Sequence, residues 1–166
     1  KLTEKEIKTL YKNMSPFALM KDIRNPFSKL KYFFKGLKFC YQRARYGFCD
    51  KDIWNLNQYL LNMTSLSMNK LAETTHTYDG RYETFEDWQK ELHRISKLLY
   101  MANEGNDYFE TPLADEYYNN LLSGKNFREK YPDACINELK ENMKKMGECK
   151  NEAMSWLKEN LYSLWD

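Results

Sequence analysis

Apolar residues recur every three or four positions along most of the chain, a spacing that predicts amphipathic helices. The clearest stripe lies between residues 85 and 102 and comprises Phe85, Trp88, Leu92, Ile95, Leu99 and Ala102. A second stripe, between residues 26 and 46, comprises Phe27, Leu30, Phe34, Leu37 and Tyr41. A third stripe comprises Ile53, Leu56, Leu60, Met63, Ser67 and Leu71. We expect all three stripes to form the inner faces of helices.

Helix-capping residues bound these segments. Residues that favour the N-cap stand at four positions, namely Thr3, Asn25, Asp50 and Thr84. Glycines that favour a helix end follow two of the segments, at Gly47 and Gly105. The pattern predicts helices over residues 3–13, 26–46, 50–73 and 84–104, with a polar loop between the last two that turns at residues 79–80.

The C-terminal third predicts two further helices, one over residues 111–124 and a long one that begins at Pro132-Asp133. If the last helix is unbroken at Gly147 it spans ~48 Å, which exceeds what a small domain needs. Its end is apolar on more than one side, at Trp156, Leu161, Tyr162, Leu164 and Trp165. Such a surface favours a homodimer or higher homo-oligomer. The alternative is that this end wraps the protein's own core.

Composition supports an all-α fold. The chain has 13 Tyr, 9 Phe and 4 Trp but no valine, so it is poor in the β-branched residues that strands favour. Its 166 residues suit a single domain over 1–166, a compact bundle of about five to six helices with a long C-terminal helix. We expect residues 1–24 to include a peripheral N-terminal helix. No apolar run is long enough for a membrane span, and residues 1–12 are too polar for a signal peptide.

Charge is distributed unevenly. Residues 1–72 carry 14 basic and 5 acidic side chains, whereas residues 73–166 carry 12 basic and 19 acidic ones. The stretch 24–45 holds seven bases and no acid. It therefore favours an anionic ligand, an acidic partner or the acidic half of the same fold. The whole chain, at +2, is not basic enough to make nucleic-acid binding the default.

No motif of a known catalytic class occurs in the sequence. It has no nucleophile elbow, zinc-protease helix, phosphate-binding loop or dinucleotide fingerprint, so we expect no enzyme and no catalytic residue. Its four cysteines form no CxxC pair, and only two histidines are present, so we expect reduced thiols, no metal and no cofactor. We place His93 on the solvated side of its helix and assign it no role.

The segment from residue 41 to 57 is the densest in arginine and aromatic side chains. Arginine offers planar donors for phosphate, aromatic rings offer stacking faces, and a helix start offers free amides. If the polar loop folds back over the turn at Gly47, its side chains complete a pocket for an anionic, nucleotide-like small molecule. The predicted ligand-binding residues are Arg43, Arg45, Tyr46, Asp50, Trp54, Asn57, His76, Tyr78 and Arg81. The alternative is that Arg43 and Arg45 clamp two helices at a tight turn.

Three blocks between residues 39 and 166 resemble a family of small, mostly uncharacterised all-helical proteins of tailed phages and prophages. They read RARYGFCDKDIWNLNQYL, THTYDGRYETFEDWQKEL and MGECKNEAMSWLKENLYSLWD. The family shows a G-[FY]-x-D-x-D-x-W box, a T-H-G-Y-P loop and a C-terminal helix that ends near L-W. Thr77 and Asp79 replace the usual glycine and proline of that loop.

The resemblance implies a phage-type accessory protein that counters host antiviral defence in the cytoplasm of an infected or lysogenic bacterium. In that setting the predicted pocket would sequester a nucleotide-derived immune signal without turning it over, as a sponge. A second hypothesis is a protein-interaction inhibitor or adaptor that docks its basic helix, residues 26–46, on an acidic partner. Nucleic acid is a less favoured partner, and we expect no membrane association.

Overall fold

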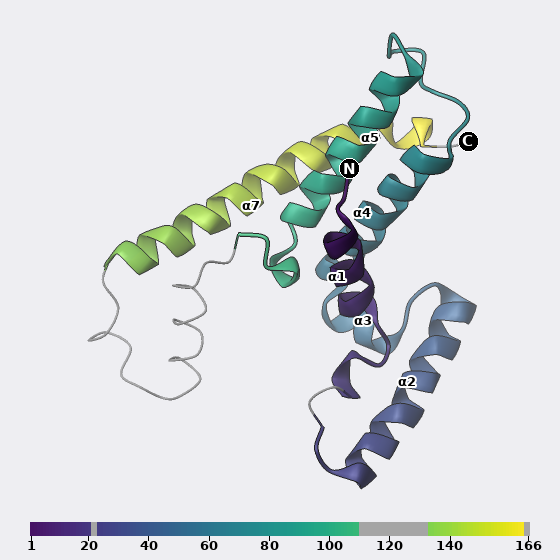
Figure 1. The fold of residues 1–166 in the computed structure, drawn as a ribbon, viewed down its shortest axis with the longest axis vertical. Coiled ribbons are helices and arrows are strands. Elements are labelled where there is room, and N and C mark those ends of the chain that lie inside the picture. Colours follow the sequence, from purple (N-terminus) through teal and green to yellow (C-terminus); the bar gives the residue numbers. More distant parts are fainter. Residues whose placement is uncertain (21–22, 110–132, 165–166) are drawn as a thin grey trace.

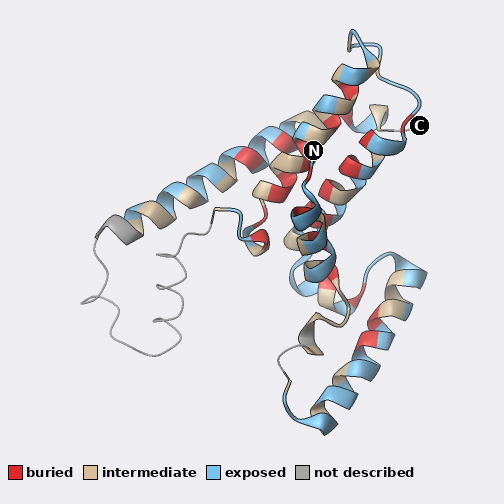
Figure 2. Cartoon of the chain, viewed as in Figure 1, coloured by how far each residue is buried: buried red, intermediate tan, exposed pale blue. Residues whose placement is uncertain are grey.

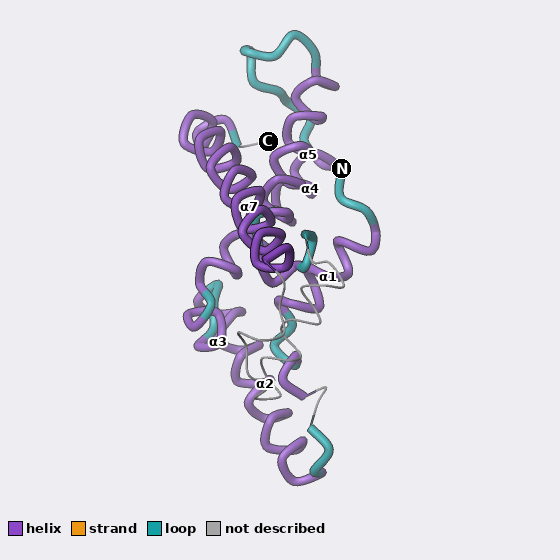
Figure 3. Tube along the Cα trace, turned by 90° about the vertical axis from the view of Figure 1, so that its left-hand side faces the viewer, coloured by secondary structure: helices purple, strands orange, loops and turns teal. Residues whose placement is uncertain are grey.

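A computed structural model describes residues 1–20, 23–109 and 133–164, and this part of the chain is all-α (Figures 1 and 3). Its α-helices are α1 (Glu4–Met14), α2 (Pro26–Tyr46), α3 (Asp50–Trp54), α4 (Leu56–Thr74), α5 (Phe85–Met101) and α7 (Asp133–Asn160). Short 3-10 turns are η1 (Ala18–Met20), η2 (Glu104–Asn106) and η3 (Leu161–Ser163). The helix expected over residues 111–124 lies outside the described residues.

Most of the predicted caps are confirmed. Thr3 and Glu6 form a reciprocal capping box at the start of α1, and the Asn25 side chain accepts from the first amides of α2. Thr84 Oγ1 accepts from the Asp87 amide at the start of α5. The prediction for Asp50 is wrong by one position, because Cys49 is the N-cap of α3. The Asp52 carboxylate accepts a hydrogen bond from the Cys49 amide. The chain also breaks at Asn55, so α3 and α4 are separate helices.

The main core lies between α4, α5 and α7. The inner stripe predicted for α5 is confirmed, since Trp88, Leu92, Ile95 and Leu99 are all buried. Trp88 stacks on Trp156 of α7 with ring centroids 5.9 Å apart. Burial of such large side chains supplies most of the stabilisation, at roughly 1.5–3 kcal/mol for each.

A smaller cluster joins α1 to this core. Leu2 and Leu10 are buried and pack with Met14 and with Tyr100 of α5. Lys97 of α5 forms an ion pair with Glu6 across the same contact. The N-terminal helix therefore contributes to the core.

The face of α4 that points inward is not the predicted one. Ile53 of α3 and Leu56, Leu60 and Met63 of α4 are exposed, although Leu71 of the predicted stripe packs against the core. The buried side of α4 carries Leu61, Asn62, Ser65, Met68, Asn69 and Ala72. Ser65 and Ser96 each donate to the other's backbone carbonyl, at 2.8 and 2.7 Å. The serine side chains are small, and their hydroxyls are hydrogen-bonded across the contact, so α4 and α5 can approach closely there. The polar stripe of α4 is therefore buried, and most of its larger apolar stripe is exposed.

Helix α2 stands away from this core at the end of the molecule opposite the residue 75–84 loop (Figures 1 and 2). Its inner side contacts η1, where Gly36 leaves room for the ring of Phe17, whose nearest atom would lie 2.3 Å from a Cβ at that position. Its predicted inner stripe is instead exposed, and Phe27 and Phe34 are 84% and 61% accessible. The expectation that this stripe faces the core is wrong.

Helix α7 is continuous through Gly147 over 28 residues, about 42 Å at ~1.5 Å per residue. Among the side chains of α7 that the structure describes, those of the C-terminal half pack on the core, including Cys149, Ala153 and Trp156. Met143, in the N-terminal half of the helix, is exposed. At the end of the helix Trp156 and Leu164 contact the core, whereas Leu161 and Tyr162 are exposed.

Candidate functional site

The turn that closes α2 requires a glycine. Gly47 has φ of 81°, in the left-handed region, and its amide donates to the Arg43 carbonyl at 2.9 Å. Tyr59 of α4 donates its hydroxyl to the Gly47 carbonyl at 2.6 Å. This turn brings the end of α2 against the start of α3 and α4, as the sequence predicts from Gly47.

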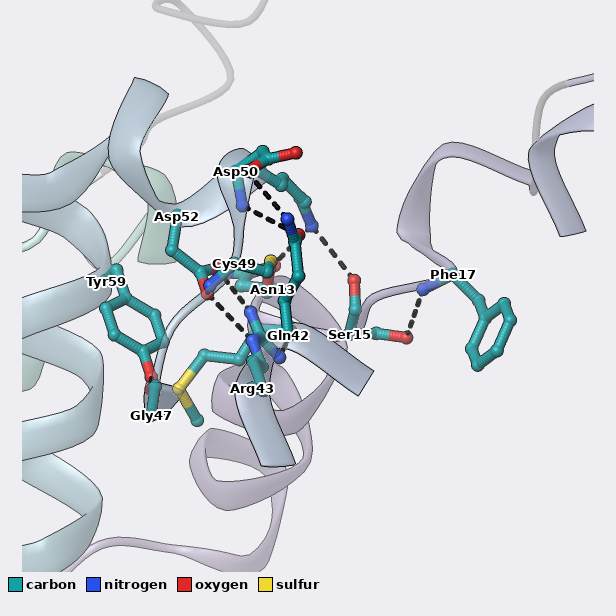
Figure 4. A network of polar contacts seen from close by, with 12 residues as sticks. Asn13, Ser15, Phe17, Gln42, Arg43, Gly47, Cys49, Asp50, Asp52 and Tyr59 are labelled. Atoms are coloured by element: carbon teal, nitrogen blue, oxygen red, sulfur yellow. Dashed lines mark hydrogen bonds and ion pairs between the residues drawn. The ribbon is translucent and has the colours of Figure 1, made fainter. Parts of the chain in front are cut away.

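Arg43 is the centre of a polar network that joins three helices (Figure 4). Its guanidinium donates from Nε to Asp52 Oδ2 at 2.8 Å and from Nη2 to Asp52 Oδ1, while Nη1 donates to the Met14 carbonyl. The guanidinium also lies over the ring of Tyr59, 5.3 Å from its centroid. The structure therefore favours the clamping role for Arg43.

The electrostatics of this pair follow from its burial. Asp52 is only 3% exposed, and burial alone would raise its carboxyl pKa. Hydrogen bonds from Arg43 and from the Cys49 amide outweigh that effect and lower the pKa of Asp52. The hydrogen bond to Asp52 in turn raises the pKa of Arg43. The pair stays ionised, and its charges neutralise each other.

The other predicted ligand residues near this turn lie on the outer surface. Arg45 is exposed with its guanidinium over the Tyr46 ring, and Trp54 is 88% exposed. Asp50 accepts from Lys38 at 2.9 Å and from Gln42 at 2.8 Å. Asn57 lines a different small cavity, beside α7. These side chains do not converge on one point.

The loop that carries His76, Tyr78 and Arg81 lies at the far end of α4 (Figure 1). The 19 residues of α4 separate it from Gly47 by about 28 Å. Arg81 binds Asp79, and it also donates to Asn160 at 2.7 Å and to Ser163 at 3.1 Å. The expectation that this loop folds back over the turn is therefore wrong, and the nine predicted residues form no common pocket.

A polar cavity of about 400 Å³ lies on the inner side of the Gly47 turn, between α1, α3, α4 and η2. None of the nine predicted residues lines it. Its wall includes two cations, Lys12 and Lys51, and carboxamides from Asn13, Asn55, Gln58 and Asn62. The sequence indicates this wall, because polar residues recur every three or four positions at 55, 58, 62, 65 and 69 and so lie on one side of a helix.

The apolar stripe of α2 is predicted to face the core but is exposed in the structure. Five apolar side chains form the stripe and are all exposed: Phe27, Leu30, Phe34, Leu37 and Tyr41. Lys31, Lys38 and Arg45, seven residues apart, run along one edge of it. The helix carries six Lys and Arg residues and no acid. We call this stripe and its basic edge the α2 face.

Comparisons with known proteins gave no match to a family model, a curated protein or a solved structure. Within the described residues, no group of three or more His, Cys, Asp or Glu side chains is placed to hold a metal ion. No helix in that part of the chain combines the length and the apolar composition needed to cross a membrane.

Proposed function

We propose that this protein is a non-catalytic interaction module that docks the α2 face on an acidic partner protein. The observation that carries the proposal is the exposure of the whole apolar stripe on a helix that stands away from the core. Contiguous exposed apolar surface of this kind marks an interaction site. Helix-in-groove binding uses the spacing of three and four residues at which these side chains stand.

The positive charge of α2 favours a partner with an acidic surface. Lys31 and Arg45 are exposed beside the stripe, and α2 has no carboxylate of its own. A groove with an apolar floor and an acidic rim would complement both features and speed association. A second α2 on that face would instead bring like charges together. The resemblance to phage proteins adds the proposal that the partner belongs to the host's antiviral defence.

A designed acidic helix tests this directly. We would titrate a Glu- and Leu-based amphipathic peptide into the protein at two salt concentrations. The double reversal Lys31→Glu/Arg45→Glu should weaken binding about tenfold or more, and added salt should weaken it too. The matched control Lys5→Glu/Lys140→Glu changes net charge equally but lies elsewhere on the surface.

Two results would contradict the proposal. Equal affinity of the two double variants would show that the basic edge plays no part. Stronger binding to anionic lipid vesicles than to the peptide would make α2 a membrane-surface helix instead.

A second candidate function is the capture of a nucleotide-derived signal without turnover. Its support is the polar cavity between α1, α3 and α4, which none of the nine predicted ligand-binding residues lines. Mass spectrometry of small molecules released from heated protein tests it, and release of an unmodified nucleotide is expected. A ligand whose mass changes on incubation with the protein would point to an enzyme.

A further inference from the structure

The polar cavity has hydrogen-bonding capacity that the described part of the fold leaves unused. Asn62 is only 4% exposed, and its Oδ1 accepts from Asn103 at 2.6 Å and from Asn106 at 3.0 Å. These two bonds fix the carboxamide, and its Nδ2 donates to none of the described residues. Since Asn62 lines the cavity, this amide is available to a bound molecule.

Two neighbours on the same wall add to this capacity. Asn55 makes no capping bond at the start of α4, although it stands at the N-cap position. Gln58 is three residues further along and one turn before Asn62, so the three carboxamides line one side of α4. The side chains of Asn55 and Gln58 each carry a donor and an acceptor, and Asn62 adds its Nδ2 donor. Donors and acceptors side by side match a base edge or another planar amide group.

The cavity is also cationic. Lys51 donates to the carbonyls of Asn13 at 3.4 Å and Ser15 at 2.9 Å, which occupies two of its three N–H groups. Burial lowers the pKa of Lys51, and the positive charge of Arg43 lowers it further. Asp52, the carboxylate in the wall, is already neutralised by Arg43, so Lys12 and Lys51 leave an excess of positive charge. An anion in the cavity would balance that charge.

We propose that this cavity binds a nucleoside monophosphate or a molecule of that chemical class. Lys51 and Lys12 would bind the phosphate, and Gln58 and Asn62 would bind the edge of the base. A volume of about 400 Å³ is within the range of small-molecule sites. The inference rests on the second candidate function and gives it a site and a ligand class.

Calorimetric titration tests the assignment with AMP, GMP, CMP and UMP, and with the matching nucleosides and inorganic phosphate as separate probes. At least one monophosphate should bind, and its affinity should fall about tenfold or more in Gln58→Ala and in Lys51→Met, each of which removes a hydrogen-bonding group. Asn57→Ala is the matched control, because Asn57 is on the same helix but does not line this cavity. Nucleoside and phosphate alone should each bind about tenfold or more weakly than the monophosphate.

The outcomes separate the site from the function. If a monophosphate binds but neither Gln58→Ala nor Lys51→Met affects it, capture of a nucleotide stands and this cavity is the wrong site. If inorganic phosphate binds as tightly as every monophosphate, the proposed recognition of the base is overturned. If none of the four binds to protein that melts normally, the assignment of a nucleoside monophosphate to this cavity is overturned. The capture function is overturned separately, if heated protein releases no nucleotide.

Discussion

At the scale of single residues, the structure separates arginines that look equivalent in the sequence. Arg43 and Arg45 are two positions apart, and the sequence predicts both as ligand-binding residues. On a helix such residues point in different directions, so Arg43 meets Asp52 while Arg45 meets solvent. Sequence spacing identifies this difference only when the buried side of the helix is known. The local turn at Gly47, by contrast, could be predicted from the glycine alone.

Replacing Arg43 should cost stability, whereas replacing Arg45 should not. Arg43→Met leaves the Asp52 carboxylate buried without its cation, at a cost of about 3 kcal/mol. Arg45→Met changes an exposed side chain and should stay within about 0.5 kcal/mol of the parent. Urea denaturation of the two variants measures the difference. Equal stabilities would contradict the clamping role of Arg43.

His93 was placed on the solvated side of α5, but it is only partly exposed and should make stability depend on pH. It is half-buried, and its Nδ1 is buried without a hydrogen-bond partner in the described part of the chain. Burial and the positive charge of Lys1 lower the pKa of His93, so the unfolded chain takes up a proton at higher pH than the folded one. This contribution to stability is present above about pH 6.5 and is lost as the pH falls toward the folded pKa.

The free energy of unfolding should therefore fall between pH 7.5 and 5.5, by at most about 1.4 kcal/mol per pH unit from this group. His93→Gln should flatten the profile across that interval. Denaturation curves at several pH values provide the measurement. An unchanged slope in the variant would show that His93 is not the group responsible.

At the scale of helices, the existence of the elements follows from the sequence but their orientation does not always. The N-terminal ends of α1, α2 and α5 are set by local caps that the sequence displays. The prediction that α5 continues to Gly105 is wrong, because the helix ends at Met101 and Gly105 lies in η2. Which side of α4 is buried depends on its contact with α5, where Ser65 and Ser96 pair. That contact is tertiary, and the apolar stripe of α4 predicts that the opposite side of the helix is buried. The polar spacing at 58, 62 and 65 was the competing signal in the same helix.

The contact between Ser65 and Ser96 should contribute measurably to the free energy of unfolding. Ser65→Ala removes the bond to the Ser96 carbonyl and should destabilise by about 1 kcal/mol. Ser67→Ala, on the exposed side of the same helix, is the control and should have little effect. A double-mutant cycle with Ser96→Ala should show coupling between the two hydroxyls. Additive effects would argue against this orientation of α4.

The α2 face should tolerate charge without loss of stability. Phe34→Asp changes a side chain that is already exposed, so the melting temperature should be nearly unchanged. Leu92→Ala removes a fully buried side chain of α5 and should cost about 2–5 kcal/mol. Thermal unfolding of both variants makes the comparison. Equal losses would mean that the stripe of α2 is part of a core after all.

At the scale of the molecule, the described chain exposes the apolar stripe at Ile53, Leu56, Leu60 and Met63. It also has two further exposed apolar regions, one at each end of the core. The α2 face is one, and Leu161 with Tyr162 at the C-terminal end of α7 is the other. Their chemistry differs, because three bases run along one edge of the α2 face, and the helix that carries it has no acid. We assign the α2 face to an acidic partner and the C-terminal end to a second copy of this chain. The sequence predicts both assignments beside alternatives, and the structure adds which apolar side chains the core leaves uncovered.

Self-association through the C-terminal end has its own test. Tyr162 is 96% exposed, so Tyr162→Asp should dissociate a dimer without unfolding it, and Phe34→Asp should leave the dimer intact. Light scattering at tens of micromolar should report about 40 kDa for the parent, twice the chain mass of 20.1 kDa. A parent protein of 20.1 kDa under those conditions would contradict the dimer.

The central claim is that α2 carries the function, and site-specific crosslinking in bacterial cells tests it most directly. A photoreactive residue would replace Phe34 on the α2 face, and the same residue at Tyr162 would serve as the control. We expect the Phe34 position to give one prominent adduct with an acidic protein, absent from the Tyr162 position and lost when Lys31→Glu/Arg45→Glu is added. Identical adducts from the two positions, or adducts from Phe34 only to a second copy of this chain, would contradict the account.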